Sequence, residues 1–396
     1  MSQWKKVKLK DICLSISDGD HLPPPKTDHG IPFITISNID STNHLDFSNT
    51  LFVPQEYYDN VDEKRKAKAG DILYSVVGSF GKPVLIMENK PFAFQRHIAI
   101  LRPDNDIVDS AFMYYAMMTC NFYMQADSVA LGAAQRTISL GSLRDMTIEM
   151  PTKDVQQRIA NILSKYDSLI ENYQQQIKLL EEAAQRLYKE WFVDLHFPGY
   201  ENTKIVDGVP VGWRKEGIGE LGEYLNGFAF KPSDWQTKGL PIIKIKELQN
   251  GVTKETPCNN GERVPKKYKI KAGDLIFSWS ATLKVVIWSG EDGWLNQHLF
   301  KVTPKTDIPR EFLLQSIASS LFKFQNLTTG STMKHIQRNK LDQVFVVVPT
   351  KDILRKYMGV AETIRSRILD LSTQLRLLTE ARDRLLPKLM SGEIEV

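Results

Sequence analysis

The stretch KAGDILYS, residues 68–75, decides how this chain is organised, because it returns as KAGDLIFS at residues 271–278. In each copy an Ala-Gly-Asp corner precedes a short run of β-branched and aromatic residues, which is typical of a strand. Glycine tolerates a backbone conformation that other residues resist, and aspartate can cap a turn. We therefore interpret the corner as a structural feature shared by two halves, rather than as a catalytic one.

Further matched phrases extend outward from this pair and occur in the same order in both halves. Written as first copy and second copy, they are WKKVKLKDI and WRKEGIGEL, GIPFITISNI and GLPIIKIKEL, FQRHIAILRP and LNQHLFKVTP, and MTIEMP and VFVVVP. Their spacing falls from 209 residues between Trp4 and Trp213 to 198 between Pro151 and Pro349, so insertions separate the matched blocks. The chain is therefore a tandem duplication with a shared frame and different inserts.

Composition excludes several classes of protein. A chain of 396 residues with 42% hydrophobic and 25% charged residues is neither disordered nor a membrane protein, and its length suggests two domains. The 51 Lys and Arg against 47 Asp and Glu permit a polyanionic partner without demanding one. The three cysteines form no C-x-x-C pair, and no apolar run is long enough for export or for a bilayer. We expect a soluble, cytoplasmic protein without disulfides or a zinc site.

Each half reads as a globular part of mixed α and β structure followed by one long helix. Helical spacing interrupts the strand-like runs at residues 110–125 and 310–325, and an amphipathic pattern without glycine or proline begins near Asp154. The fold class is α+β. The predicted globular domains are 1–152 and 197–351, and the predicted long helices with their tails are 153–196 and 352–396.

The two long helices are predicted to pair with each other, because each leaves one apolar stripe that must be covered. The predicted seam consists of Ile159, Ile162, Tyr166, Leu169, Tyr173, Ile177, Leu180 and Leu187 in the first helix and of Ile364, Ile368, Leu371, Leu375, Leu378 and Leu385 in the second. A rod of this kind would measure roughly 55–60 Å. If a pseudo-twofold axis relates the halves, the helices are antiparallel, and the second one is expected to end at Pro387.

A rod with two unlike heads suits a target that has two separated contact regions, and duplex DNA is such a target. Four further phrases carry a resemblance to a known family: LYKEWFVDLHFPG from Leu187, VPVGWR from Val209, the GST at Gly330 and LLPKLMSGEIEV from Leu385. Over essentially its full length the chain resembles the specificity subunit of type I restriction-modification systems.

The resemblance implies a function without chemistry of its own. In that family each half holds a target recognition domain that reads one part of a split DNA sequence, and the paired helices set the unread gap. Two modification subunits supply S-adenosylmethionine binding and adenine methylation, and motor-nuclease restriction subunits complete the enzyme. The chain itself contains no [ND]-P-P-[FY] motif, no Gly-rich cofactor loop and no phosphate loop, so we expect no cofactor.

Two features that could suggest chemistry have structural interpretations. The DGDH segment at Asp18 resembles a metal site, but its counterpart NGFAF at Asn226 keeps no carboxylate, which favours a polar loop. His97 and His298 are equivalent, yet no second ligand or base accompanies both. We interpret them as hydrogen-bonding or phosphate-facing residues.

The residues expected to contact DNA lie in three loops that recur in both halves. Side chains of Arg, Lys, Asn and Gln read base edges, and basic residues hold phosphates. The candidates are Lys82, Gln95, Arg96, Gln135 and Arg136 in the first half, and Lys284, Gln297, Lys334, His335 and Arg338 in the second. For each of them, a solvated surface residue is the alternative.

Two other functions compete with this interpretation. The helices could form the seam of a homodimeric coiled-coil scaffold with no role on DNA. The duplication argues against it, because each helix already has a partner in the same chain. The chain could instead be a fragment of a restriction enzyme that fuses recognition with methylation, which the missing methyltransferase motifs oppose.

Overall fold

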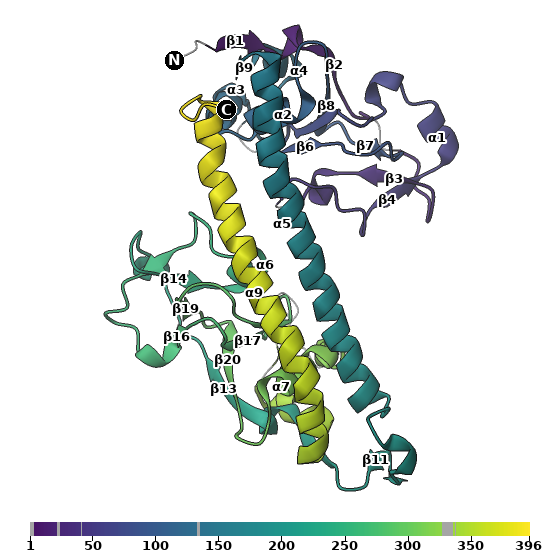
Figure 1. The fold of residues 1–396 in the computed structure, drawn as a ribbon, viewed down its shortest axis with the longest axis vertical. Coiled ribbons are helices and arrows are strands. Elements are labelled where there is room, and N and C mark those ends of the chain that lie inside the picture. Colours follow the sequence, from purple (N-terminus) through teal and green to yellow (C-terminus); the bar gives the residue numbers. More distant parts are fainter. Residues whose placement is uncertain (1–3, 22–23, 41, 133–134, 327–335, 337) are drawn as a thin grey trace. The chain divides into compact units, whose positions relative to one another are not determined.

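The computed structural model describes residues 4–21, 24–40, 42–132, 135–326, 336 and 338–396. The chain forms two compact units: unit 1 comprises Met1–Ile170 and Leu377–Val396, and unit 2 comprises Glu171–Arg376. Two long helices, α5 (Lys153–Tyr188) and α9 (Lys351–Met390), each belong partly to one unit and partly to the other (Figure 1). Among the described residues, no helix is long and apolar enough to cross a membrane.

In its described residues, unit 1 is built from short strands and four short α-helices beside its parts of the two long helices. Its strands are β1 (Lys5–Lys8), β2 (Cys13–Asp18), β3 (Ile31–Ile34), β4 (Leu51–Val53), β5 (Ile72–Ser75), β6 (Pro83–Leu85), β7 (Ala93–Phe94), β8 (Ile98–Pro103) and β9 (Thr147–Met150). Its short helices are α1 (Gln55–Asp59), α2 (Ser110–Met117), α3 (Cys120–Val129) and α4 (Leu140–Asp145). In the described part the strands form the sheets β2-β8-β5-β6, β4-β3-β7 and β1-β9.

Unit 2 repeats this plan. Its strands are β10 (Ile205–Val206), β11 (Val209–Pro210), β12 (Arg214–Gly217), β13 (Gly222–Asn226), β14 (Leu240–Ile243), β15 (Cys258–Asn259), β16 (Lys269–Ile270), β17 (Leu275–Ser278), β18 (Lys284–Ile287), β19 (Gly293–Leu295), β20 (Leu299–Pro304) and β21 (Phe345–Val348). Its short helices are α6 (Ile245–Asn250), α7 (Arg310–Ser319) and α8 (Leu321–Gln325). The strands form the sheets β13-β20-β17-β18, β15-β14-β19-β16 and β12-β21, and the hairpin β10-β11. The predicted α+β duplication is confirmed.

The repeated phrase forms an inner strand of two corresponding sheets, β5 in β2-β8-β5-β6 of unit 1 and β17 in β13-β20-β17-β18 of unit 2. At the corner before β5, Gly70 has φ = 92°, a value that L side chains rarely adopt. Asp71 accepts the Lys68 amide at 2.8 Å and receives two guanidinium bonds from Arg102 on β8, at 2.8 and 2.9 Å. The Asp71 side chain is almost fully buried. It therefore fixes the corner to the neighbouring strand.

The corner before β17 has the same geometry with a different cation. Gly273 has φ = 93°, and Asp274 accepts the Lys271 amide at 2.9 Å. Lys301 of β20 donates to the Asp274 carboxylate at 2.7 Å. The structural interpretation of both Ala-Gly-Asp corners therefore agrees with the geometry.

The helical pieces at 110–125 and 310–325 are confirmed, whereas the second long helix differs in one detail from the prediction. Each of the two segments forms two helices, and in unit 1 the Thr119 hydroxyl accepts the Phe122 amide at the start of the second one. The expectation that the second long helix ends at Pro387 is wrong. Helix α9 continues to Met390, and the Ser391 amide donates to the Pro387 carbonyl at 3.0 Å. A proline in the last turn removes one donor without preventing the bonds that follow it.

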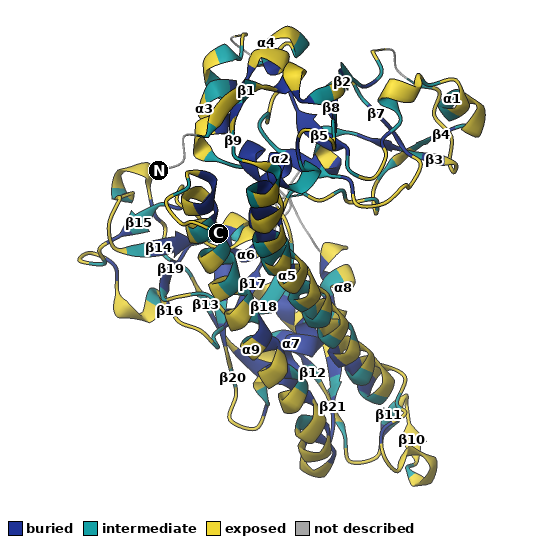
Figure 2. Ribbon diagram, turned by 45° about the horizontal axis from the view of Figure 1, so that its top comes forward, coloured by how far each residue is buried: buried dark blue, intermediate teal, exposed yellow. Residues whose placement is uncertain are grey.

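Each unit has its own apolar core, into which one share of each long helix packs (Figure 2). In unit 1 the first turns of α5, with Ile159 and Leu163, join a cluster that contains Leu386 and Leu389 of α9. In unit 2 the core includes Tyr188 at the end of α5 and residues of the first turns of α9. Within each unit the beginning of one long helix therefore packs in the same core as the end of the other.

Candidate nucleic-acid interface

The three predicted loops of unit 1 meet at the segment 76–82, which connects β5 and β6. The Val76 amide donates to the His97 carbonyl at 2.9 Å, and the Gly78 amide donates to the Arg136 carbonyl at 2.9 Å. The Ile138 amide donates back to the Val76 carbonyl at 2.8 Å. Backbone bonds thus hold the loops that carry Gln95, Arg96, Gln135 and Arg136 against one central loop.

Two of the candidate side chains in unit 1 lie free of side-chain partners. Arg96 and Gln135 are exposed, and neither makes a side-chain hydrogen bond or ion pair with any residue in the described ranges. Gln95 is half-buried, and its amide donates to the Ile34 carbonyl at 3.1 Å. Partial burial, together with the charge of Arg96, lowers the pKa of the neighbouring His97 and so favours its neutral ring.

Arg136 is held within the protein. Its guanidinium pairs with the Asp127 carboxylate at 2.5 Å and lies over the Phe80 ring, 5.3 Å from the centroid. The Phe80 ring stacks on Tyr123, with centroids 5.9 Å apart and an interplanar angle of 14°. The Tyr123 side chain is exposed. The structure therefore presents a stacked cation and two aromatic rings at this loop, a feature that sequence spacing gave no means to find.

Unit 2 has a corresponding loop with different side chains. The Ile336 amide donates to the Trp279 carbonyl at 2.9 Å, as Ile138 does to Val76 in unit 1. The Trp279 indole N–H donates to Asn226 Oδ1 at 3.1 Å, and its ring lies 5.8 Å from that of His298. Gln297 is half-buried, and Arg338 is exposed at the start of a 3₁₀ helix (Arg338–Gln343). The candidates Lys334 and His335 lie outside the described residues.

The two candidate lysines occupy equivalent places. Lys82 Nζ donates to the Asp40 carbonyl and Lys284 Nζ to the Leu248 carbonyl, both at 3.4 Å. Asp40 lies in the segment that follows β3, and Leu248 lies in the segment that follows β14. An ammonium has three protons, so each lysine keeps donors for a further acceptor. Both are partly buried, which places their charge close to the protein surface.

The DGDH segment is tied together by protein groups rather than open for a metal. His21 lies 2.7 Å from an Asp18 oxygen, and Arg65 lies 3.7 Å from Asp18 and 3.6 Å from Asp20. The Tyr57 hydroxyl donates to Asp20, and burial followed by this bond raises the pKa of Tyr57. Across the described ranges, no cluster of three or more His, Cys, Asp or Glu side chains is arranged to hold a metal ion.

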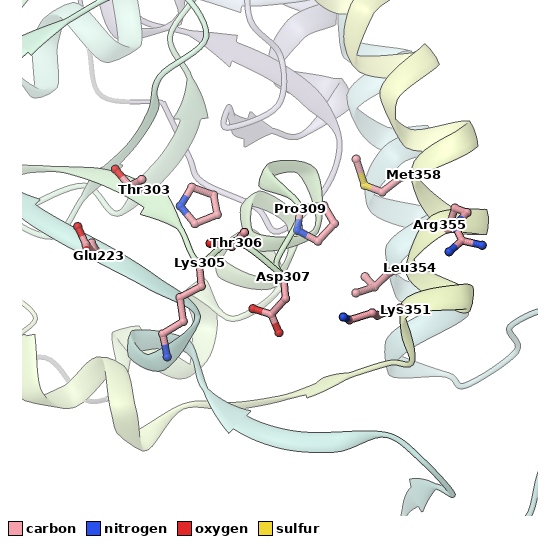
Figure 3. Close-up of a pocket in the computed structure, with 11 residues that line it drawn as sticks. Glu223, Thr303, Lys305, Thr306, Asp307, Pro309, Lys351, Leu354, Arg355 and Met358 are labelled. Atoms are coloured by element: carbon pink, nitrogen blue, oxygen red, sulfur yellow. The ribbon is translucent and has the colours of Figure 1, made fainter.

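A hollow of about 800 Å³ in unit 2 lies away from these loops. Figure 3 shows Lys351, Leu354, Arg355 and Met358 on the first turns of α9 beside the loop that follows β20. Asp307 on that loop pairs with Arg214 at 2.7 Å. The hollow contains none of the DNA-contact candidates.

The residues of the predicted helix seam fall into four groups. Ile159, Ile162 and Leu385 join the core of unit 1, and Leu187 joins the core of unit 2. Ile368 and Leu371 are buried, whereas Leu169 is 38% exposed. The remaining seam residues are half-buried: Tyr166, Tyr173, Ile177, Leu180, Ile364, Leu375 and Leu378.

Sequence spacing missed the polar contacts of the helices. In unit 1 Asp167 of α5 accepts from Arg382 Nη1 of α9 at 2.8 Å and from the Tyr115 hydroxyl of α2 at 2.6 Å. In unit 2 Arg365 of α9 donates to Glu311 of α7 at 2.9 Å. The heptad pattern of a sequence indicates which residues form an apolar stripe, but it does not indicate which charged residues pair with each other.

Comparisons with known proteins identify the class. The family model described as type I restriction modification DNA specificity domain matches residues 1–182 and 210–370. The HindI specificity subunit of Haemophilus influenzae is 25% identical and aligns over 100% of both chains. The MjaIX specificity subunit of Methanocaldococcus jannaschii is 25% identical over 74% of this chain and 70% of its own.

A solved structure has the same fold. The S subunit of a type I restriction-modification system from M. genitalium superposes with a TM-score of 0.57, covering 98% of this chain and 96% of that one at 16% identity. Fold and matched residues together define a duplicated specificity protein. The chain belongs to the family of type I restriction modification DNA specificity domains.

Proposed function

We propose that this chain is the DNA-binding specificity subunit of a type I restriction-modification complex and reads a split target. In this proposal residues 1–152 and 197–351 form two target recognition domains, and the segments 153–196 and 352–396 set the unread gap. The chain carries no catalytic group and no cofactor. It directs two methyltransferase subunits, and the motor-nuclease restriction subunits, to the site.

One observation carries the proposal: the two units share a frame but differ in the side chains at the same loop. Val76 and Trp279 occupy one backbone position, since each accepts the corresponding isoleucine amide. Around the first lie Phe80 and Arg136, and around the second lies His298. Bases are distinguished by the side chains that reach groove edges. A shared frame with different loop chemistry supports two different half-sites.

The candidate contacts divide by their environment. Exposed Arg96, Gln135 and Arg338, with half-buried Gln95 and Gln297, are proposed to reach base edges or phosphates. Lys82 and Lys284 are proposed to hold phosphates. The stack of Arg136 and Phe80 suits a flat base or sugar surface. Lys334 and His335 complete the proposed set.

The coiled-coil scaffold is the competing function. It requires each long helix to lie free for a second copy of the chain. In unit 1, however, Ile159 of α5 already packs in one core with Leu389 of α9. No described contact favours the scaffold over the specificity subunit.

The test is to coexpress this chain with a neighbouring methyltransferase subunit and to map methylated adenines across the host genome by long-read sequencing. The expected result is a split motif with a fixed gap that disappears when this chain is deleted. A methylated motif that persists without this chain would overturn the proposal, and so would the absence of any motif in the presence of an active methyltransferase.

A further inference from the structure

The two long helices are nearly equivalent along their apolar stripes, which raises the question of what selects their partner. Aligned at the spacing of 198 residues that relates Pro151 to Pro349, Lys153 corresponds to Lys351 and Leu187 to Leu385. Ile170 corresponds to Ile368, and both are buried. In a dimer of two chains, α5 of one copy could therefore pair with α5 of the other, or α9 with α9, through a similar apolar face. Apolar contacts alone do not discriminate between these pairings.

The charged residues at two corresponding positions break this equivalence. Asp167 of α5 corresponds to Arg365 of α9, and Ala184 of α5 corresponds to Arg382 of α9. Within unit 1 Arg382 pairs with Asp167 at 2.8 Å, and only 17% and 18% of the two side chains are exposed. The same position of the two helices thus carries opposite charge, and in unit 1 Asp167 of α5 meets a cation of α9.

The surroundings of Asp167 and Arg365 show that both charges are built into their units. In unit 1 the Tyr115 hydroxyl donates to the second Asp167 oxygen at 2.6 Å, so the carboxylate is bonded on both sides. In unit 2 Arg365 donates to Glu311 at 2.9 Å. Burial raises the pKa of Glu181 on α5, and the positive charge of Arg365 opposes that rise. Neither residue can turn to solvent without leaving a partner behind.

We propose that the Asp167–Arg382 pair selects the pairing of α5 with α9 and excludes pairing of like helices from two copies of the chain. In a pair of two α9 helices with the same geometry, Arg382 of one copy would face Arg365 of the other. In a pair of two α5 helices, Asp167 would face Ala184 and lose its cation. Like-charge contacts suppress wrong partners, and charged pairs set partner choice in coiled coils. Each chain then pairs its own two long helices without a second copy.

Charge reversal at Arg382 provides the sharpest test. Arg382→Asp places a carboxylate opposite Asp167 within the chain, and it creates an attractive contact with Arg365 between two α9 helices. Full-length chains with two different affinity tags are coexpressed, and mixed species are measured by tandem purification and native mass spectrometry. We expect about tenfold more mixed species for Arg382→Asp than for the wild-type chain. The double variant Asp167→Arg/Arg382→Asp is expected to give fewer mixed species than Arg382→Asp alone, because the attraction within the chain is restored while the contact with Arg365 remains.

Three controls separate partner selection from general damage. Tyr115→Phe removes the hydrogen bond to Asp167 but keeps the ion pair, and Arg158→Asp reverses an exposed charge that, among the described residues, pairs with Asp154 on the same helix. Both are expected to behave as wild type. Arg382→Gln, which removes the charge without reversing it, is expected to give an intermediate level of exchange and covers the case in which the reversed chain does not fold.

The proposal is overturned if Arg382→Asp and Arg382→Gln exchange no more than Arg158→Asp. It is equally overturned if the double variant exchanges as much as Arg382→Asp alone. These measurements report helix pairing and involve no DNA, so their outcome is independent of the specificity function proposed above.

Discussion

Arg365 of α9 donates from Nε to Oε1 of Glu311 in α7 at 2.9 Å, and less than a tenth of either side chain is exposed. Burial raises the pKa of Glu311, and the charge and hydrogen bond of Arg365 oppose that rise. The carboxylate therefore depends on the arginine to remain ionised in its buried site. This pair connects a long helix to the core of unit 2.

Removal of Arg365 is expected to be costly. The variant Arg365→Met leaves the Glu311 carboxylate buried without a cation, and we expect the free energy of unfolding to fall by about 3 kcal/mol. Urea denaturation followed by tryptophan fluorescence measures the change. The double variant Glu311→Leu/Arg365→Met should lose less than the single one, since no charge remains buried. The exposed Arg355, 3.7 Å from Asp352, is the matched control, and Arg355→Met should cost at most about 0.5 kcal/mol.

The backbone conformation of Gly273, at the corner before β17, leads to a second prediction. Alanine at Gly273 must adopt φ = 93°, so Gly273→Ala is expected to destabilise the protein by about 1–2 kcal/mol. Gly359 lies inside α9 with open space around a Cβ, and Gly359→Ala is expected to stabilise by about 0.5–1 kcal/mol. Equal effects of the two substitutions in thermal unfolding would contradict the assigned backbone conformations.

The thiol of Cys13 should react slowly and in a pH-dependent way. Burial, and then the charges of Asp104 and Asp71, raise the pKa of Cys13 to about 12. Because the thiolate is the reactive form, alkylation of Cys13 should accelerate about tenfold per pH unit between pH 7 and 9. The variant Cys120→Ser removes the exposed thiol. Peptide mass spectrometry of this variant then measures the alkylation rate of Cys13 separately from that of the half-buried Cys258.

The same shift in pKa affects stability. The folded thiol of Cys13 holds its proton to a higher pH than the unfolded chain, whose thiol has its ordinary value near 9. Unfolding therefore releases a proton above pH 9. The contribution is fully present below that value and is lost as the pH rises toward 12, so Cys13→Ser should lose less stability than wild type between pH 8 and 10.

Two exposed arginines test the reading of separate half-sites. Arg96→Ala is expected to relax specificity in one part of the methylated motif, and Arg338→Ala in the other. If the arginine contacts a base, the free energy of binding to the motif should weaken by about 1–3 kcal/mol. If it contacts a phosphate, affinity falls for all sequences and the salt dependence of binding decreases by about one ion. Arg158→Ala on the exposed face of α5 is the control. A change in both half-sites from one substitution would contradict independent domains.

The length of the helices tests how the gap is set. Insertion of one helical turn after Gln175 and after Thr373, which occupy corresponding positions, lengthens both helices by about 6 Å. We expect a gap longer by about two base pairs with unchanged half-sites, as read from the methylated motif. A changed half-site, or an unchanged gap in a chain that still directs methylation, would refute the role of the helices as a spacer.

Local patterns in the sequence predicted most of the fold. KAGDILYS and KAGDLIFS predicted equivalent strands, and these are β5 and β17. The apolar period of α5 and α9 predicted two long helices whose ends lie within a few residues of those observed. Such patterns work because they depend on neighbours in the chain, and because duplication supplies each one twice.

The contacts that depend on distant residues could not be predicted. Nothing near Asp167 in the sequence indicates Arg382, and nothing near Arg136 indicates the stack of Phe80 on Tyr123. The parallel pairing of β3 with β7 likewise joins segments about 60 residues apart. Residue type alone indicates Arg96 and Gln135 as candidates for DNA contact. Only the structure shows that both side chains are exposed.

The division of unit 1 between the two ends of the chain has a consequence for synthesis. A ribosome completes every residue of unit 2 before it supplies 377–396, whose residues Leu386 and Leu389 share the core of Ile159. The core around Ile159 therefore cannot be complete until residues 377–396 have been made, although most residues of unit 1 emerge first. Folding of unit 1 is thus coupled to the synthesis of a segment that lies beyond the whole of unit 2.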